Sequence, residues 1–136
     1  MDADKTMQKW LNAFAKDVAE HVLQEHVLSA GNYLWHLFSY GYAPCLEGDA
    51  ARKAFDALRY ESAFKFRQAY VKVERPEGRC LAAYGIELPV RTAKLTAAQL
   101  EKNRKETDVY IVAEDFSWTY VHTHEDGWCG PYFARR

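Results

Sequence analysis

The stretch that decides the fold runs from Asp108 to Phe133 and reads DVYIVAEDFSWTYVHTHEDGWCGPYF. Its alternating pattern, broken around 114–116, predicts an antiparallel hairpin in which residues 108–113 pair with residues 117–124. Two sets of side chains each share one face of this hairpin: Val109, Ile111 and Ala113 on the first strand, and Phe116, Trp118, Tyr120, His122 and His124 on the second. We expect the face that carries Trp118 and Tyr120 to be at least half buried.

Length and composition favour a single globular domain over residues 1–136. The chain is 49% apolar and 15% aromatic, which is enough to build a core. Its 18 basic and 19 acidic side chains leave a net charge of −1, so we expect no nucleic-acid partner. No apolar run approaches the length of a membrane span, and the N-terminal residues lack the apolar core of a signal peptide. We therefore expect a cytoplasmic protein without a membrane partner.

Three helices are predicted in the N-terminal part of the chain. The first covers about 5–27 and is amphipathic, with apolar residues at Met7, Leu11, Phe14, Val18 and Val22. The second, YLWHLFSY at 33–40, is apolar on nearly every side, so we expect it to be buried with His36 as a neutral core or boundary imidazole. The third begins after Asp49 as its N-cap and ends near Arg59.

The periodicity changes to two from Ser62 onward, which predicts a strand over about 62–73. The apolar set changes parity near Gln68, which indicates a bulge or a sharp twist. A turn is predicted at 75–78, because Pro and Gly stand at its second and fourth positions, and a second strand follows over about 82–88.

A capping box at Thr96 and Gln99 predicts a polar helix that ends near Lys105. The residues available for packing there are Leu95, Ala98 and Leu100, so we expect this helix to lie on the surface as a lid or spacer. The order of elements predicts an α+β fold in which N-terminal helices pack on a mainly antiparallel sheet of about four strands.

Four blocks of the sequence resemble a family of small bacterial proteins that is described as a domain of unknown function. They are LWHLFSY at 34–40, CLEGDAARKAFD at 45–56, FSWTYVHTHE at 116–125 and CGPYF at 129–133. The terminal blocks are the most specific. The resemblance implies a bacterial origin and a single-domain protein, and it assigns no activity or site residue.

One hypothesis for the terminal block is a metal site. His122 and His124 stand two apart on a predicted strand, so they would project to one side and could bind one zinc ion, with Glu125 or Cys129 as a further ligand. The plainer interpretation is that a His-x-His pair on an aromatic strand binds no metal. We therefore expect no resident cofactor and keep zinc as the alternative.

A second hypothesis is a Cys/His hydrolase-like enzyme with Cys129 as its nucleophile. His122 or His124 would act as the base, and Glu125 would orient the imidazole. The plainer interpretation makes Cys129 a small buried apolar residue.

The hypothesis that needs the fewest unobserved features is a protein-binding surface. Trp118, Tyr120, Trp128 and Tyr132 are of residue types that are enriched where proteins contact each other. A small bacterial domain of this kind fits, for instance, an immunity protein that neutralises a toxin. The alternative is that these four rings belong to the core.

Overall fold

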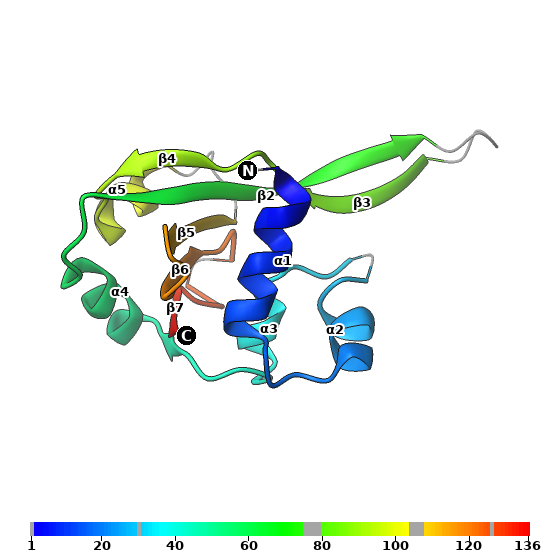
Figure 1. Cartoon of the computed structure of the whole chain (residues 1–136), viewed down its shortest axis with the longest axis horizontal. Coiled ribbons are helices and arrows are strands. Elements are labelled where there is room, and N and C mark those ends of the chain that lie inside the picture. The colour runs from blue at the N-terminus through cyan, green and yellow to red at the C-terminus, as the bar shows by residue number, and fades with distance from the viewer. Residues whose placement is uncertain (1, 30, 75–79, 104–107, 126) are drawn as a thin grey trace.

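The computed structural model describes residues 2–29, 31–74, 80–103, 108–125 and 127–136, and the side chains of 69–74 and 80–84 are outside the description. Within these residues the chain forms five α-helices and seven β-strands (Figure 1). The helices are α1 (Ala3–Phe14), α2 (Glu20–His26), α3 (His36–Ser39), α4 (Asp49–Asp56) and α5 (Ala97–Lys102). The strands are β1 (Leu46–Glu47), β2 (Ser62–Glu74), β3 (Cys80–Ile86), β4 (Val90–Ala93), β5 (Val109–Ala113), β6 (Trp118–His122) and β7 (Tyr132–Arg135).

The strands form one antiparallel sheet in the order β1-β7-β6-β5-β2-β3, with β4 also paired to β2. The α+β fold is as predicted, but the prediction of about four strands is wrong, because the described sheet has seven. β1 and β7 are too short to produce an alternating pattern. The strand predicted at 82–88 corresponds to β3, which ends at Ile86, and β4, which begins at Val90, is a further strand that the prediction lacks.

The predicted C-terminal hairpin is confirmed. β5 and β6 pair antiparallel, with Ile111 opposite Tyr120. Every residue of both strands is buried, however, so each strand contributes to the core on both of its faces. Phe116, which was expected on the Trp118 face, packs instead into the opposite cluster. The backbone φ of Phe116 is +58° in this turn, which directs its side chain toward the opposite face.

Two hydrophobic clusters therefore cover the two faces of the β5–β6–β7 part of the sheet. Figure 1 shows α1, α2 and α3 to one side of these strands and α4 and α5 to the other. The first cluster holds Trp10, Phe14, Leu37, Phe38, Tyr110, Val121 and Tyr132, and the second holds Phe55, Leu100, Ile111, Trp118, Tyr120 and Phe133. A buried Trp10 Nε1–H also donates to Thr119 Oγ1 at 3.0 Å, which fastens α1 to β6.

The N-terminal helices differ from the sequence prediction. The single helix predicted over 5–27 is divided into α1 and α2 by a break at Ala15, which allows residues from both helices to reach the same cluster. The helix predicted over 33–40 shrinks to one turn, α3, so its residues do not become buried on every side. Asp49 is the first residue of α4, and the N-cap is Gly48 with a φ of 66°.

The predictions for the middle of the chain are largely met where it is described. The capping box at Thr96 and Gln99 is present, but α5 packs into the core through Ala97 and Leu100 and is not a separate surface element. At Gln68, where a bulge or twist was predicted, β2 stops pairing with β5 and its pairing with β3 begins. The turn predicted at 75–78 lies outside the described residues.

We predict that Tyr120→Ala lowers the free energy of unfolding by about 3 to 5 kcal/mol, because a buried aromatic side chain is replaced by a cavity. The Tyr120 ring is stacked on Phe55 with 4.1 Å between centroids. Denaturant unfolding of the purified variant measures the loss. As a control, Leu88→Ala removes an exposed apolar side chain and should change stability by about 0.5 kcal/mol or less. Equal losses in the two variants would contradict this assignment of the core.

Candidate functional site

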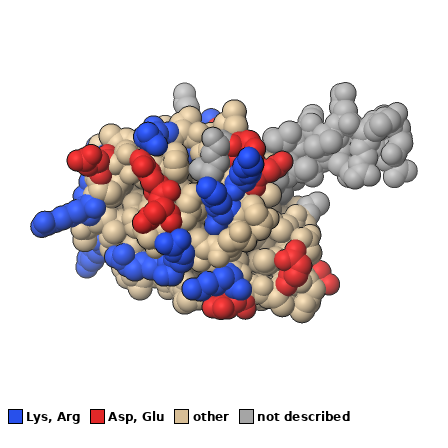
Figure 2. All heavy atoms as spheres, in the orientation of Figure 1, with Lys and Arg blue, Asp and Glu red and all other residues tan. Residues whose placement is uncertain are grey.

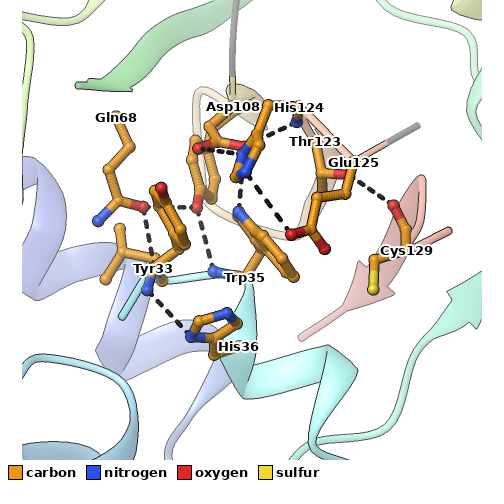
Figure 3. A network of polar contacts seen from close by, with 11 residues as sticks. Tyr33, Trp35, His36, Gln68, Asp108, Thr123, His124, Glu125 and Cys129 are labelled. Carbon is orange, nitrogen blue, oxygen red and sulfur yellow. Dashed lines mark hydrogen bonds and ion pairs between the residues drawn. The ribbon is translucent and has the colours of Figure 1, made fainter. Parts of the chain in front are cut away.

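A buried carboxylate lies at the centre of the most densely hydrogen-bonded part of the molecule. The Asp108 side chain is only 3% exposed, immediately before β5 (Figure 3). Its Oδ1 accepts from Trp35 Nε1–H at 3.1 Å and from the backbone N–H of His124 at 2.9 Å. The His124 Nδ1 lies 2.9 Å and 3.1 Å from the two carboxylate oxygens. Asp108 thus joins the chain before α3 to the residues that follow β6.

A second network reaches the same region from β2. Gln68 Oε1 accepts from the Leu34 N–H at 2.9 Å and from the Tyr110 hydroxyl at 2.8 Å, and the Tyr110 oxygen accepts from the Trp35 N–H. Complete burial raises the pKa of Tyr110 well above its usual value. The Gln68 N–H also donates to the Asp108 carbonyl. The segment before α3 is therefore held by side chains from two different strands.

His124 is oriented by Asp108 and packed among aromatic rings. A carboxylate only accepts hydrogen bonds, so the contact with Asp108 places a proton on Nδ1. The side chain is 30% exposed, and its Nε2 lies 3.8 Å from Glu125 Oε1. Its ring centroid is 5.0 Å from that of Tyr33 and 5.9 Å from that of Trp35.

These contacts continue into a row of rings that we call the aromatic–histidine face. It consists of Tyr33, His36, Tyr40, Tyr42 and His124. Successive centroids along the row are 5.0, 5.4, 4.7 and 6.0 Å apart, and both Tyr40 and Tyr42 are exposed. A face of this kind offers large, rigid rings with polar atoms to a binding partner.

His36 lies in the middle of this face and not deep in the core. Its Nδ1 accepts from the Tyr33 N–H at 3.1 Å. Burial lowers the pKa of His36, although the carboxylates of Glu125 and Asp108 act in the opposite direction. The predicted neutral imidazole at the core boundary agrees with this environment.

The chain after β6 forms a compact turn that we call the Trp128 turn, residues 123–131 without the undescribed residue 126. Thr123 Oγ1–H donates to the Cys129 carbonyl, and the N–H groups of Trp128 and Cys129 both donate to the Glu125 carbonyl. Gly130 has a φ of 83°, and a Cβ there would meet Tyr132 and Thr123 at 3.2 to 3.3 Å, so glycine fits where a larger residue would be strained. The turn is thus fixed on both sides of Trp128.

The four rings predicted to form a binding surface are divided by the structure. Trp118, Tyr120 and Tyr132 are buried in the two clusters, so they are core residues and are not available to a partner. These residues lie on strands whose two faces are both covered by other elements. The sequence pattern of one strand cannot reveal that its second face is also covered. Trp128, in contrast, is 91% exposed.

His122 and His124 are not arranged as a pair of ligands on one face. His122 is buried and follows Tyr120 in the alternation of β6, and its Nδ1 has no hydrogen-bond partner. His124 lies beyond the end of β6 and contacts Tyr33 and Trp35 on the helical side. Within the described ranges, no group of three His, Cys, Asp or Glu side chains is placed to hold a metal ion.

Cys129 is partly exposed in the Trp128 turn, where its environment disfavours the thiolate. Burial and a hydrogen bond to Glu125 raise the pKa of this thiol, and the charge of Glu47 acts in the same direction. A thiol nucleophile needs the opposite shift. This environment does not support the role of nucleophile for Cys129, with His122, His124 and Glu125 as the other residues considered for catalysis.

Two hollows lie beside the β5–β6 turn. A hollow of about 470 Å³ opens beside the β5–β6 turn and is lined by Tyr60, Glu114 and Trp118, among others. Another, of about 360 Å³, lies between α1 and the same turn. Neither hollow includes His124, Glu125 or Cys129.

A model of the family described as "Domain of unknown function (DUF4275)" matches residues 4–133. The chain belongs to this family. No curated protein and no solved structure matches the chain. The resemblance noted in the sequence is thereby confirmed, and two of the blocks that carry it form one structural unit. LWHLFSY supplies α3 with His36 and Tyr40 of the aromatic–histidine face, and FSWTYVHTHE supplies β6 and His124.

Sequence reasoning missed Asp108, Tyr33 and Tyr40 as site residues. Asp108 has a positive φ of 48°, a conformation in which Asp and Asn are enriched, and an acid directly before a fully apolar strand is the local signal that could have drawn attention to it. The sequence pattern places Tyr33 and Tyr40 in a buried helix, but both lie outside the short α3, where Tyr33 is half-buried and Tyr40 is exposed.

We predict that Asp108→Ala lowers the free energy of unfolding by about 3 kcal/mol. The change leaves the indole N–H of Trp35 and the amide of His124 without their buried acceptor. Glu61→Ala, at an exposed position, is the control and should change stability by about 0.5 kcal/mol or less. A loss below about 1 kcal/mol in the Asp108 variant would show that the network does not hold the site together.

Proposed function

We propose that this protein is a binding module that recognises another protein through the Trp128 turn and the adjoining aromatic–histidine face. The observation that carries the proposal is the exposure of Trp128, which is 91% accessible on the turn between the buried strands β6 and β7. Of the four Trp side chains in the chain, the other three are buried.

An exposed indole contributes little to the stability of the folded protein. Burial of a large aromatic side chain contributes roughly 2 to 3 kcal/mol, and Trp128 forgoes this contribution. It does so on a turn that is fixed by hydrogen bonds from Thr123, Trp128 and Cys129. A backbone that is ordered before binding loses less conformational entropy in a complex, so an exposed Trp on a fixed turn is well suited to act as an interface anchor.

The neighbouring residues extend this anchor into a surface. His124 belongs both to the Trp128 turn and to the aromatic–histidine face, and Glu125 lies 3.8 Å from it. The exposed Tyr40 and Tyr42 continue the row of rings. An aromatic centre with polar groups at its edge is the usual composition of a protein–protein contact.

The finer form of the proposal is an immunity protein of the bacterial cytoplasm, with a toxin as its partner. Its support is a candidate site that is an exposed surface with an aromatic anchor. Within the described residues, no helix is long and apolar enough to cross a membrane.

The test is capture of the partner from the native host by tagged full-length protein, with two variants that each remove an exposed apolar side chain. Trp128→Ala should weaken the complex by about 2 kcal/mol or more, because an anchor residue is lost, while stability stays within about 0.5 kcal/mol of wild type. Leu88→Ala is the matched control, since Leu88 is 67% exposed beside β4, and it should bind like wild type. A partner that both variants retain equally well would overturn the proposal.

A further inference from the structure

Charge is distributed very unevenly along this nearly neutral chain. Residues 17–51 and 106–134 contain no Lys or Arg, yet they hold 11 of the 19 Asp and Glu residues. All 18 Lys and Arg residues lie in the remaining segments. The two segments without Lys or Arg supply α2, α3, β1 and the whole stretch from β5 to the Trp128 turn.

The fold brings these two segments together. β1 pairs with β7, with Glu47 opposite Tyr132, and Asp108 ties the start of β5 to Trp35. Figure 2 shows the consequence over α2, at the lower right of the view, where acidic side chains stand without basic ones. The residues of the Trp128 turn and the aromatic–histidine face all come from these two segments, which hold carboxylates but no Lys or Arg.

Two carboxylates flank the base of the Trp128 turn. Glu47 is exposed, and its Oε1 accepts from the Gly130 N–H at 3.3 Å. Glu125 is also exposed, and the charges of both groups act on the Cys129 thiol that follows Trp128 in the chain. Among the ion pairs of the described residues, neither Glu47 nor Glu125 pairs with Lys or Arg, whereas Asp49, Glu87 and Glu114 each have an Arg partner.

We propose that the partner presents a Lys- or Arg-rich segment, with a cationic side chain placed over the Trp128 ring and within reach of Glu47 and Glu125. This inference rests on the proposed function and specifies the chemistry of its partner. A cation over an indole face gains a cation–π attraction, and nearby carboxylates add to it. The absence of Lys and Arg from both segments removes like-charge repulsion that would oppose such a partner.

The first experiment measures binding of a short, fluorescently labelled peptide of alternating Lys and Arg to the full-length protein by anisotropy at low ionic strength. Glu47→Gln with Glu125→Gln should weaken binding about fivefold, and Trp128→Ala should weaken it at least about threefold. The glutamine at 47 keeps an oxygen acceptor for Gly130. Asp4→Asn with Glu61→Gln is the matched control, because it makes the same change in net charge at exposed positions outside the two segments, and it should shift binding less than about twofold.

Equal weakening by the two double variants would reduce the effect to net charge and overturn the proposal. Binding of an alternating Asp and Glu peptide as tightly as the cationic peptide would also overturn it. A dimer that depends on Trp128, detected by sedimentation, would mean that a second copy of the chain binds this surface through its basic segments. That result would also contradict a separate partner.

Measurements on the native complex distinguish the proposed cationic partner from the protein-binding function on which it rests. A complex that is weakened by Trp128→Ala, but is insensitive both to the glutamine pair and to added salt, would refute the cationic partner and leave the protein-binding function standing. A complex unaffected by any of these changes would refute both.

Discussion

Burial of both faces of the β5–β6–β7 strands constrains everything else in this structure. α1 to α3 cover one face and α4 and α5 cover the other, so the apolar residues of these strands are divided between two clusters. The aromatic residues of β6 and β7 are buried in these clusters. Apart from the β5–β6 turn, the described part of the terminal block that is accessible to a partner lies where the chain leaves the sheet, after His122 and before Tyr132.

The Asp108 carboxylate fixes the start of the segment that leaves the sheet after β6. It lies where β5 begins and accepts from Trp35 on one side and from His124 on the other, so the end of β6 and the segment before α3 are joined through one buried group. A buried carboxylate is tolerated when its hydrogen-bonding capacity is filled, and the contacts of Asp108 fill it. The Trp128 turn and the aromatic–histidine face are therefore parts of one surface and not two independent features.

The local elements of this protein can be predicted from the sequence, and the site cannot. The capping box at Thr96 and the alternation of 109–113 depend on near neighbours, and both are recovered. The second covered face of β5 and β6 depends on α4 and α5, which are distant in sequence. The contacts of Asp108 with Trp35 and of Gln68 with Leu34 likewise join residues that are far apart in sequence. No local sequence pattern therefore predicts these contacts. The short α3 shows the same limit, because a run that is apolar all round was taken as a buried helix.

The division of the terminal block into a buried core and one exposed indole is most directly tested by acrylamide quenching of tryptophan fluorescence. Trp10, Trp35 and Trp118 are buried, and Trp128 is almost fully exposed. The wild-type protein should therefore show one strongly quenched component, and Trp128→Phe should remove that component without changing the unfolding transition. Quenching that persists unchanged in the variant would mean that another Trp is accessible, and the account of a two-sided core with a single presented ring would be wrong.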